Sequence, residues 1–243
     1  MIYGTLLFIV AVLAGAVAAI SGFGIGSLLT PLLALRHETK LAVAIVSVPH
    51  LVGTAARFLT LKQNVDRKVF WRFGVFSALG GLFGALLNAR IQSPALSIVF
   101  GSLLIFAGSS GLTGLASKVH FGRKAAWVAG GASGFFGGLV GNQGGIRSAA
   151  LFGFDISKEA FVATATAVAL TVDGVRMPVY LATQTHGVIA AWPEILIAMA
   201  GALAGTFWGV RLLRRIPEQN FRHLVSALIA ALGIYMLIHG VVR

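Results

Sequence analysis

The stretch "GGLVGNQGGIRSAALFGF", residues 137–154, decides how the whole chain is interpreted. It begins and ends apolar, but Asn142, Gln143, two glycines and Arg147 interrupt its middle. Glycine permits a sharp turn and lets other groups approach the backbone. An arginine inside a membrane segment costs at least about 2.5–3.5 kcal/mol and therefore usually has a function. The stretch predicts a helix that breaks inside a membrane.

The composition supports a membrane location. The 243 residues are 57% hydrophobic and 11% charged, with a mean hydropathy of +0.90, whereas soluble domains carry about 25% charged residues. The net charge of +12 comes mostly from short connections between apolar segments, where basic residues set membrane orientation. We therefore expect an integral membrane protein with no nucleic-acid partner.

The apolar segments fall into two classes by length, near 20 residues and near 30 residues. Eight are recognised, at about 4–35, 41–61, 69–89, 94–116, 125–154, 160–182, 189–209 and 218–240. Six suit one crossing each, but a single helix over 4–35 would reach roughly 48 Å at 1.5 Å per residue. The hydrocarbon core is only about 30 Å thick. Both long segments break at glycine-rich sequences, "SGFGIGS" at 21–27 and "GNQGG" at 141–145, so each is predicted to be a helical hairpin.

The two halves of the chain resemble each other. A shift of 119 places residues 15–58 on 134–177 without a gap, and 8 of the 44 positions are identical. The identical pairs include Gly15 and Gly134, Gly22 and Gly141, Gly26 and Gly145, and Arg57 and Arg176. We predict a first membrane repeat over 1–116, a basic cytoplasmic connector over 117–124 and a second repeat over 125–243.

The positions of the basic residues choose between two topologies. Eight full crossings would place eight loop lysines and arginines on each side, with no bias. Re-entrant hairpins instead place 12 on one side and 4 on the other, as the positive-inside rule favours. The predicted fold is therefore an all-α polytopic membrane protein of two inverted repeats. Each repeat has a re-entrant hairpin and three transmembrane helices, and both termini lie outside.

The charges within the apolar segments favour an anion. Arg57, Arg147, Arg176 and Asp173 sum to +2, and a helix that starts inside the membrane presents free N–H groups at its positive end. The break "GNQGGIR" thus predicts an anion cradle in which the Arg147 fork holds oxygens. The candidate substrate-binding residues are Gly22, Gly24, Gly26, Asn142, Gln143, Gly144, Gly145, Arg147, Arg57 and Arg176.

Structural interpretations of these residues stay open. Arg57 could extend to the cytoplasmic surface, Arg176 could form an i, i+3 salt bridge with Asp173, and Arg147 could be a packing residue. His50 and Asp173 are candidates for carrying a coupling proton, but the commoner role of a histidine such as His50 is that of a hydrogen-bonded core residue.

The glycine breaks resemble those of one known family. The sequences "SGFGIGSLLTPLL" and "GFFGGLVGNQGGIRSAALF" each open a four-segment repeat, and the chain is similar over essentially its whole length to the sulfite exporter TauE/SafE family, also called TSUP or DUF81 permeases. The resemblance implies secondary transport of small, often sulfur-containing anions such as sulfite and organosulfonates. Asn142 and Gln143 depart from the more glycine-rich family pattern.

These observations predict a permease or exporter that binds its anion between the two breaks near the membrane midplane and works by alternating access. An anion-selective channel and a membrane-embedded enzyme or assembly factor are the alternatives. Catalytic motifs are missing, and no cofactor or metal is expected. The expected partners are a small anion, the lipid bilayer and a proton or cation as coupling ion, with a homodimer left open. We expect the protein in the bacterial inner membrane.

Overall fold

The computed structural model describes residues 2–22, 24–114, 125–141, 144, 147, 151, 154, 156–213 and 218–242. All the regular elements in these ranges are helices. They are α1 (Ile2–Ser21), α2 (Ile25–Leu33), α3 (Thr39–Leu61), the 3₁₀ turn η1 (Lys62–Asn64), α4 (Arg67–Arg90), α5 (Ser93–Thr113), α7 (Ala125–Val140), α9 (Lys158–Ala190), α10 (Trp192–Leu213) and α11 (Glu218–Val242). The predicted connector over 117–124 lies outside the described residues.

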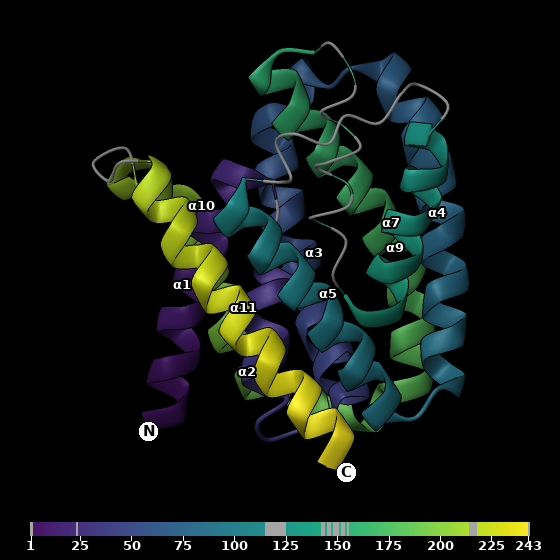
Figure 1. Ribbon diagram of the computed structural model, residues 1–243, viewed down its shortest axis with the longest axis vertical. Coiled ribbons are helices and arrows are strands. Elements are labelled where there is room, and N and C mark those ends of the chain that lie inside the picture. Colours follow the sequence, from purple (N-terminus) through teal and green to yellow (C-terminus); the bar gives the residue numbers. More distant parts are fainter. Residues whose placement is uncertain are drawn as a thin grey trace.

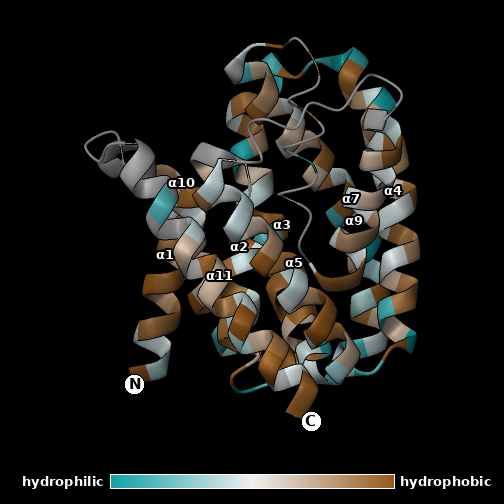
Figure 2. Cartoon of the chain, viewed as in Figure 1, coloured by the Kyte–Doolittle hydropathy of each residue, from teal (hydrophilic) through white to brown (hydrophobic). Residues whose placement is uncertain are grey.

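Several helices suit a membrane. Within the described residues, five segments are long and apolar enough to cross one. They are Ile2–Ala19, Thr39–Asn64, Arg67–Arg90, Ser93–Thr113 and Glu159–Ala190. Figure 2 shows hydrophilic residues gathered where helices end, while α1 is mainly hydrophobic along its length. The protein is thus an all-helical chain whose apolar surfaces match a lipid environment.

The first long segment is interrupted where the sequence predicts. Helix α1 ends at Ser21, Gly22 and Gly24 take positive φ angles of 78° and 144°, and α2 begins at Ile25. With nine residues, α2 is only roughly 14 Å long. The chain then returns to the end where α1 began, since the Arg36 guanidinium lies 3.7 Å from the centre of the Tyr3 ring. The segment is therefore a helical hairpin.

Three helix pairs pack with their backbones in close contact. Helix α1 lies against α10, α4 against α7, and α5 against α11. A methyl group on Gly15 would overlap the Ala202 carbonyl, one on Gly84 the Phe135 carbonyl, and one on Gly108 the Ser226 carbonyl. Small residues allow this approach, as is usual for membrane helices.

Helix α3 also packs against α9, so the two halves of the chain meet there as well. The two ends of the chain emerge at the same end of the molecule (Figure 1). Helix α9 is longer than the sequence predicts, because it runs through residues 183–188 to Ala190 and is kinked at Gln184. The backbone is non-helical at Gln184, so a break does fall within this polar stretch, and the chain is helical again beyond it. Thr183 and Thr185 donate to carbonyls one turn earlier, a contact that often bends helices. The end follows at Ala191, before Pro193.

Candidate functional site

The first hairpin arm and α7 end in the same way. Gly22 follows α1 with φ 78°, and Gly141 follows α7 with φ 76°. The Gly22 N–H donates to the Ala18 carbonyl at 3.0 Å, and the Gly141 N–H donates to the Gly137 carbonyl at 3.0 Å. This is the left-handed C-terminal cap, which glycine adopts without a steric penalty. The two glycines thus terminate two helices inside the protein by one mechanism.

An arginine completes each cap. Arg57 Nη1 donates to the Ala18 carbonyl at 2.7 Å, and Arg176 Nη1 donates to the Gly137 carbonyl at 2.5 Å. These are the carbonyls that already accept from Gly22 and Gly141. A cation at a helix C-terminus is favourable because that end is negative. The two buried arginines therefore stabilise the ends of α1 and α7.

The burial of Arg57 overturns one interpretation of the sequence. Its side chain is 3% exposed, so it does not extend to the surface. Its Nε also donates to the Thr166 hydroxyl at 2.9 Å, which links α3 to α9. Desolvation of the guanidinium is offset here by hydrogen bonds and by the negative end of α1.

The two glycine breaks lie against each other. A methyl group on Gly26 would overlap the carbonyl oxygen of Gly141. One on Gly141 would lie 3.6 Å from Arg176 Nη1 and 3.9 Å from the Thr30 hydroxyl. The absence of a side chain at Gly26 thus brings the two breaks together, with Arg176 and Thr30 at their side.

Arg147 connects the second break to the first. Its side chain is 1% exposed, and Nη2 donates to the Gly22 carbonyl at 2.8 Å. Within the part of the chain that the structure describes, Arg147 Nε and Nη1 have no hydrogen-bond partner, nor do the hydroxyls of Thr30 and Thr54. Buried donors without partners are unfavourable. Arg147 therefore has capacity to bind a further group.

A buried acid links α3 and α9. Asp173 Oδ2 lies 2.7 Å from His50 Nδ1, and Oδ1 lies 2.7 Å from Arg176 Nη2. The alternative salt bridge between Arg176 and Asp173 is thus present, and so is the hydrogen-bonded core histidine. Both findings leave a proton-carrying role for the pair untested.

The electrostatics of this cluster are positive. Arg57, Arg176 and Asp173 all interact electrostatically with Arg147. With the three arginines charged, Asp173 ionised and His50 neutral, the sum is +2, which attracts an anion. Among the described residues, no group of three His, Cys, Asp or Glu side chains could hold a metal ion.

Of the remaining predicted site residues, two are described by the structure and three are not. Gly24 precedes α2 and lies against Val17, and Gly144 is buried. Asn142, Gln143 and Gly145 lie outside the described residues. Sequence reasoning missed Thr166, Thr30 and Thr54, because threonine is common in membrane helices and gives no periodic signal. Their contacts depend on how helices from the two halves meet.

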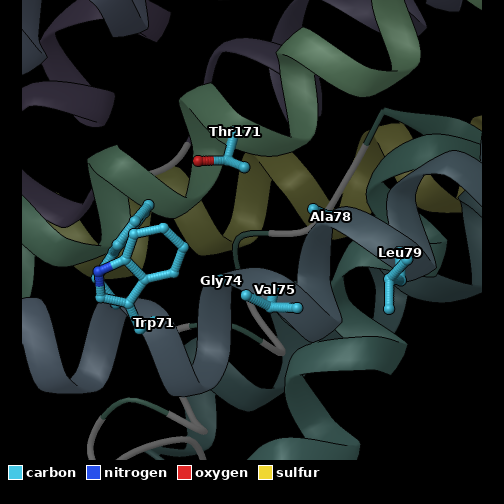
Figure 3. A pocket seen from close by; sticks show the side chains of 7 residues that line it. Trp71, Gly74, Val75, Ala78, Leu79 and Thr171 are labelled. Carbon is cyan, nitrogen blue, oxygen red and sulfur yellow. The ribbon is translucent and has the colours of Figure 1, made fainter.

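A groove between α4 and α9 has none of these arginines in its lining (Figure 3). Its lining residues are Phe70, Trp71, Gly74, Val75, Ala78, Leu79 and Thr171. Its one hydroxyl, on Thr171, donates to the Ala167 carbonyl. An anion would find no charged partner among these residues, so the groove is not a candidate for the site.

Comparison with known proteins agrees with the sequence resemblance. A family model described as sulfite exporter TauE/SafE matches residues 7–236. None of the curated proteins and none of the solved structures matches the chain. The match covers nearly the whole chain, and members of this family are membrane permeases for sulfite and related sulfur compounds rather than enzymes. With its apolar helices and its buried, positively charged cluster, the chain belongs to the sulfite exporter TauE/SafE family of membrane transporters.

Proposed function

We propose that this chain is a secondary transporter of a small sulfur-containing anion, such as sulfite or an organosulfonate, and that the anion binds beside the two glycine breaks near the membrane midplane. The state of Arg147 carries the proposal. It is 1% exposed, and two of its three nitrogens have no partner within the described residues. An oxyanion would satisfy both nitrogens with charge-assisted hydrogen bonds.

Groups near the two breaks suit an oxyanion with several oxygens. The unpartnered hydroxyl of Thr30 faces Gly141, and that of Thr54 lies on α3 one turn before Arg57, so both are further donors in the described part of the chain. Arg57 and Arg176 hold the helix ends in place and contribute positive charge. A sulfite or sulfonate group presents three oxygens, so it can use arginine and hydroxyl donors together.

We also propose that the fold consists of two inverted repeats, over 1–116 and 125–243, joined by the connector 117–124. The matching caps support this: the pairs Gly22–Gly141, Ala18–Gly137 and Arg57–Arg176 are each separated by 119 residues. The packing of α1 on α10 and of α4 on α7 is the exchange that a two-fold axis between the repeats would produce. Inverted repeats suit alternating access around a central site.

A thermal-shift screen tests the substrate class. The purified protein would be heated with sulfite, sulfate, thiosulfate, sulfoacetate, taurine or a simple carboxylate. A ligand that binds only the folded protein raises its free energy of unfolding, by about 2.7 kcal/mol when the ligand concentration is 100 times its Kd, and so raises the melting temperature. We expect the sulfur oxyanions to raise it most. A shift with carboxylates alone would contradict the substrate class.

A flux measurement separates the transporter from the alternative channel. Flux of the anion without coupling to a second ion would favour the channel.

We further propose that the protein lies in the bacterial inner membrane with both termini outside. The predicted charge split of 12 to 4 supports this orientation. The natural chain has no cysteine, so single cysteines can be introduced directly. Gln63, in η1, and Gln92, before α5, are both exposed and lie at the two ends of α4.

In whole cells, an impermeant thiol reagent should label Gln92→Cys and leave Gln63→Cys unlabelled. Permeabilised cells should label both, which controls for accessibility. Ser117→Cys and Arg214→Cys should behave like Gln63→Cys, although both positions lie outside the described residues. Labelling of Gln63→Cys but not Gln92→Cys in whole cells would show that the protein has the opposite orientation.

A further inference from the structure

The two arginine caps differ in one respect. Arg57 and Arg176 hold equivalent carbonyls, but Arg176 also contacts Asp173. At a shift of 119, the residue that corresponds to Asp173 is Thr54. Arg57 therefore holds its cap without a carboxylate one turn away. The cap alone gives no reason for Asp173 to be present.

The histidine is unmatched in the same way. His50 corresponds to Ala169 in the second half of the chain. Burial of a histidine and a carboxylate, 8% and 1% exposed, is unfavourable unless each is paired. The fold therefore contains one buried acid–histidine pair, with His50 from the first half and Asp173 from the second, bridging α3 and α9 at 2.7 Å. The positions that a shift of 119 relates to this pair hold Ala169 and Thr54, which cannot form such a pair.

We propose that Asp173 is the resident counter-ion of Arg176, that a substrate anion takes over this role when it binds, and that the His50–Asp173 pair then takes up one proton. This inference rests on the proposed anion site beside Arg147. The anion and the proton would occupy the protein together, so they would cross the membrane in the same direction.

The physical reason is electrostatic. An anion beside Arg147 and Arg176 adds negative charge close to Asp173 and competes for its arginine. Like charges nearby favour protonation of a carboxylate, and an unpaired charge inside the membrane is strongly disfavoured. Proton uptake removes both penalties. The proton belongs to the coupled pair, held between Asp173 Oδ2 and His50 Nδ1.

The other ionisable groups around the pair are three arginines and one tyrosine. Arg57 on α3, Arg176 and Tyr180 on α9, and Arg147 interact electrostatically with His50 or Asp173. In the absence of substrate, the arginines favour an ionised Asp173 and a neutral His50. An anion that offsets part of this positive charge makes protonation of the pair easier.

Calorimetry of sulfite binding tests the inference. Titrations in two buffers of different ionisation enthalpy, at one pH, give the number of protons taken up per anion bound. Sulfite itself can change protonation, so the informative quantity is the difference between the natural protein and Asp173→Asn. We expect this difference to reach about one proton near neutral pH. Asp173→Asn should still bind sulfite, but without the proton uptake that the His50–Asp173 pair contributes.

Two further variants test whether the proton uptake belongs to the His50–Asp173 pair. Asp173→Thr introduces the residue that the first half carries at the matching position, so it should fold and should also lack the proton uptake. Glu194→Gln is the matched control, because Glu194 and His37 form another acid–histidine pair at 2.6 Å, with side chains 19% and 22% exposed. It should take up as many protons as the natural protein.

The outcomes separate the two proposals. Sulfite binding with equal proton uptake in the natural protein, Asp173→Asn and Asp173→Thr would overturn this inference alone. Failure of the folded natural protein to bind sulfite would instead contradict the proposed substrate, and the proton inference with it.

Discussion

Replacing Arg147 with glutamine should weaken anion binding by about 10–150-fold, since a lost charged hydrogen bond costs roughly 1.5–3 kcal/mol. The protein should still fold, because Arg147 makes only one hydrogen bond within the described residues, to the Gly22 carbonyl, and the glutamine amide can still donate. Arg147→Lys should recover part of the affinity, because an ammonium keeps the charge but lacks the planar set of donors. Calorimetry with sulfite would measure both variants.

The matched control is Arg90→Gln, which makes the same chemical change at an exposed arginine in the last turn of α4. It should leave affinity unchanged, because exposed charges contribute little. Natural affinity in a folded Arg147→Gln variant would show that Arg147 is a packing residue. The anion would then have to be sought around Arg57 and Arg176.

Gly26→Leu should abolish transport. A side chain at this position would overlap the Gly141 carbonyl, so the two breaks would have to separate and Arg176 and Thr30 would shift with them. Overpacking of this kind costs typically about 1–3 kcal/mol of stability. Gly26→Ala should show a smaller loss, in both melting temperature and uptake of sulfite into proteoliposomes.

Gly174→Ala is the control for the glycine variants. Gly174 follows Asp173 on α9, is exposed, and has no atom within 4 Å of the position a methyl group would take. Alanine is the better helix former by about 0.8–1.0 kcal/mol, so this variant should melt no lower than the natural protein and transport normally. Normal melting and transport in Gly26→Leu would refute the idea that contact between the breaks positions the site.

Much of the fold follows from the sequence because the membrane restricts what a chain can do. Apolar length predicted α3, α4, α5 and α11 within a few residues. The break after α1 was predictable as well, since a helix over residues 4–35 exceeds the bilayer and glycine stands at the point of interruption. The course of α9 after residue 182 was not, because the polar residues at 183–188 kink the helix at Gln184 without opening a loop.

The candidate site was predictable in its charges and less so in its contacts. A buried arginine in an apolar segment is conspicuous, and Arg57, Arg147 and Arg176 could be found from the sequence. The sequence did not reveal that Arg57 and Arg176 bind the carbonyls of Ala18 and Gly137. Carbonyls are present at every residue, so only the three-dimensional arrangement selects the two that accept from an arginine.

The glycine-lined helix pairs determine which parts of the protein can move as rigid bodies. Each pair, α1 with α10, α4 with α7 and α5 with α11, joins one helix from either half of the chain, with backbones in contact. Rocking one half against the other would separate all three interfaces, whereas a shift between α3 and α9 would mainly exchange side-chain hydrogen bonds such as His50–Asp173. If the close backbone contacts persist during transport, each rigid unit will combine helices from both halves of the chain, and its boundaries will differ from those of the sequence repeats.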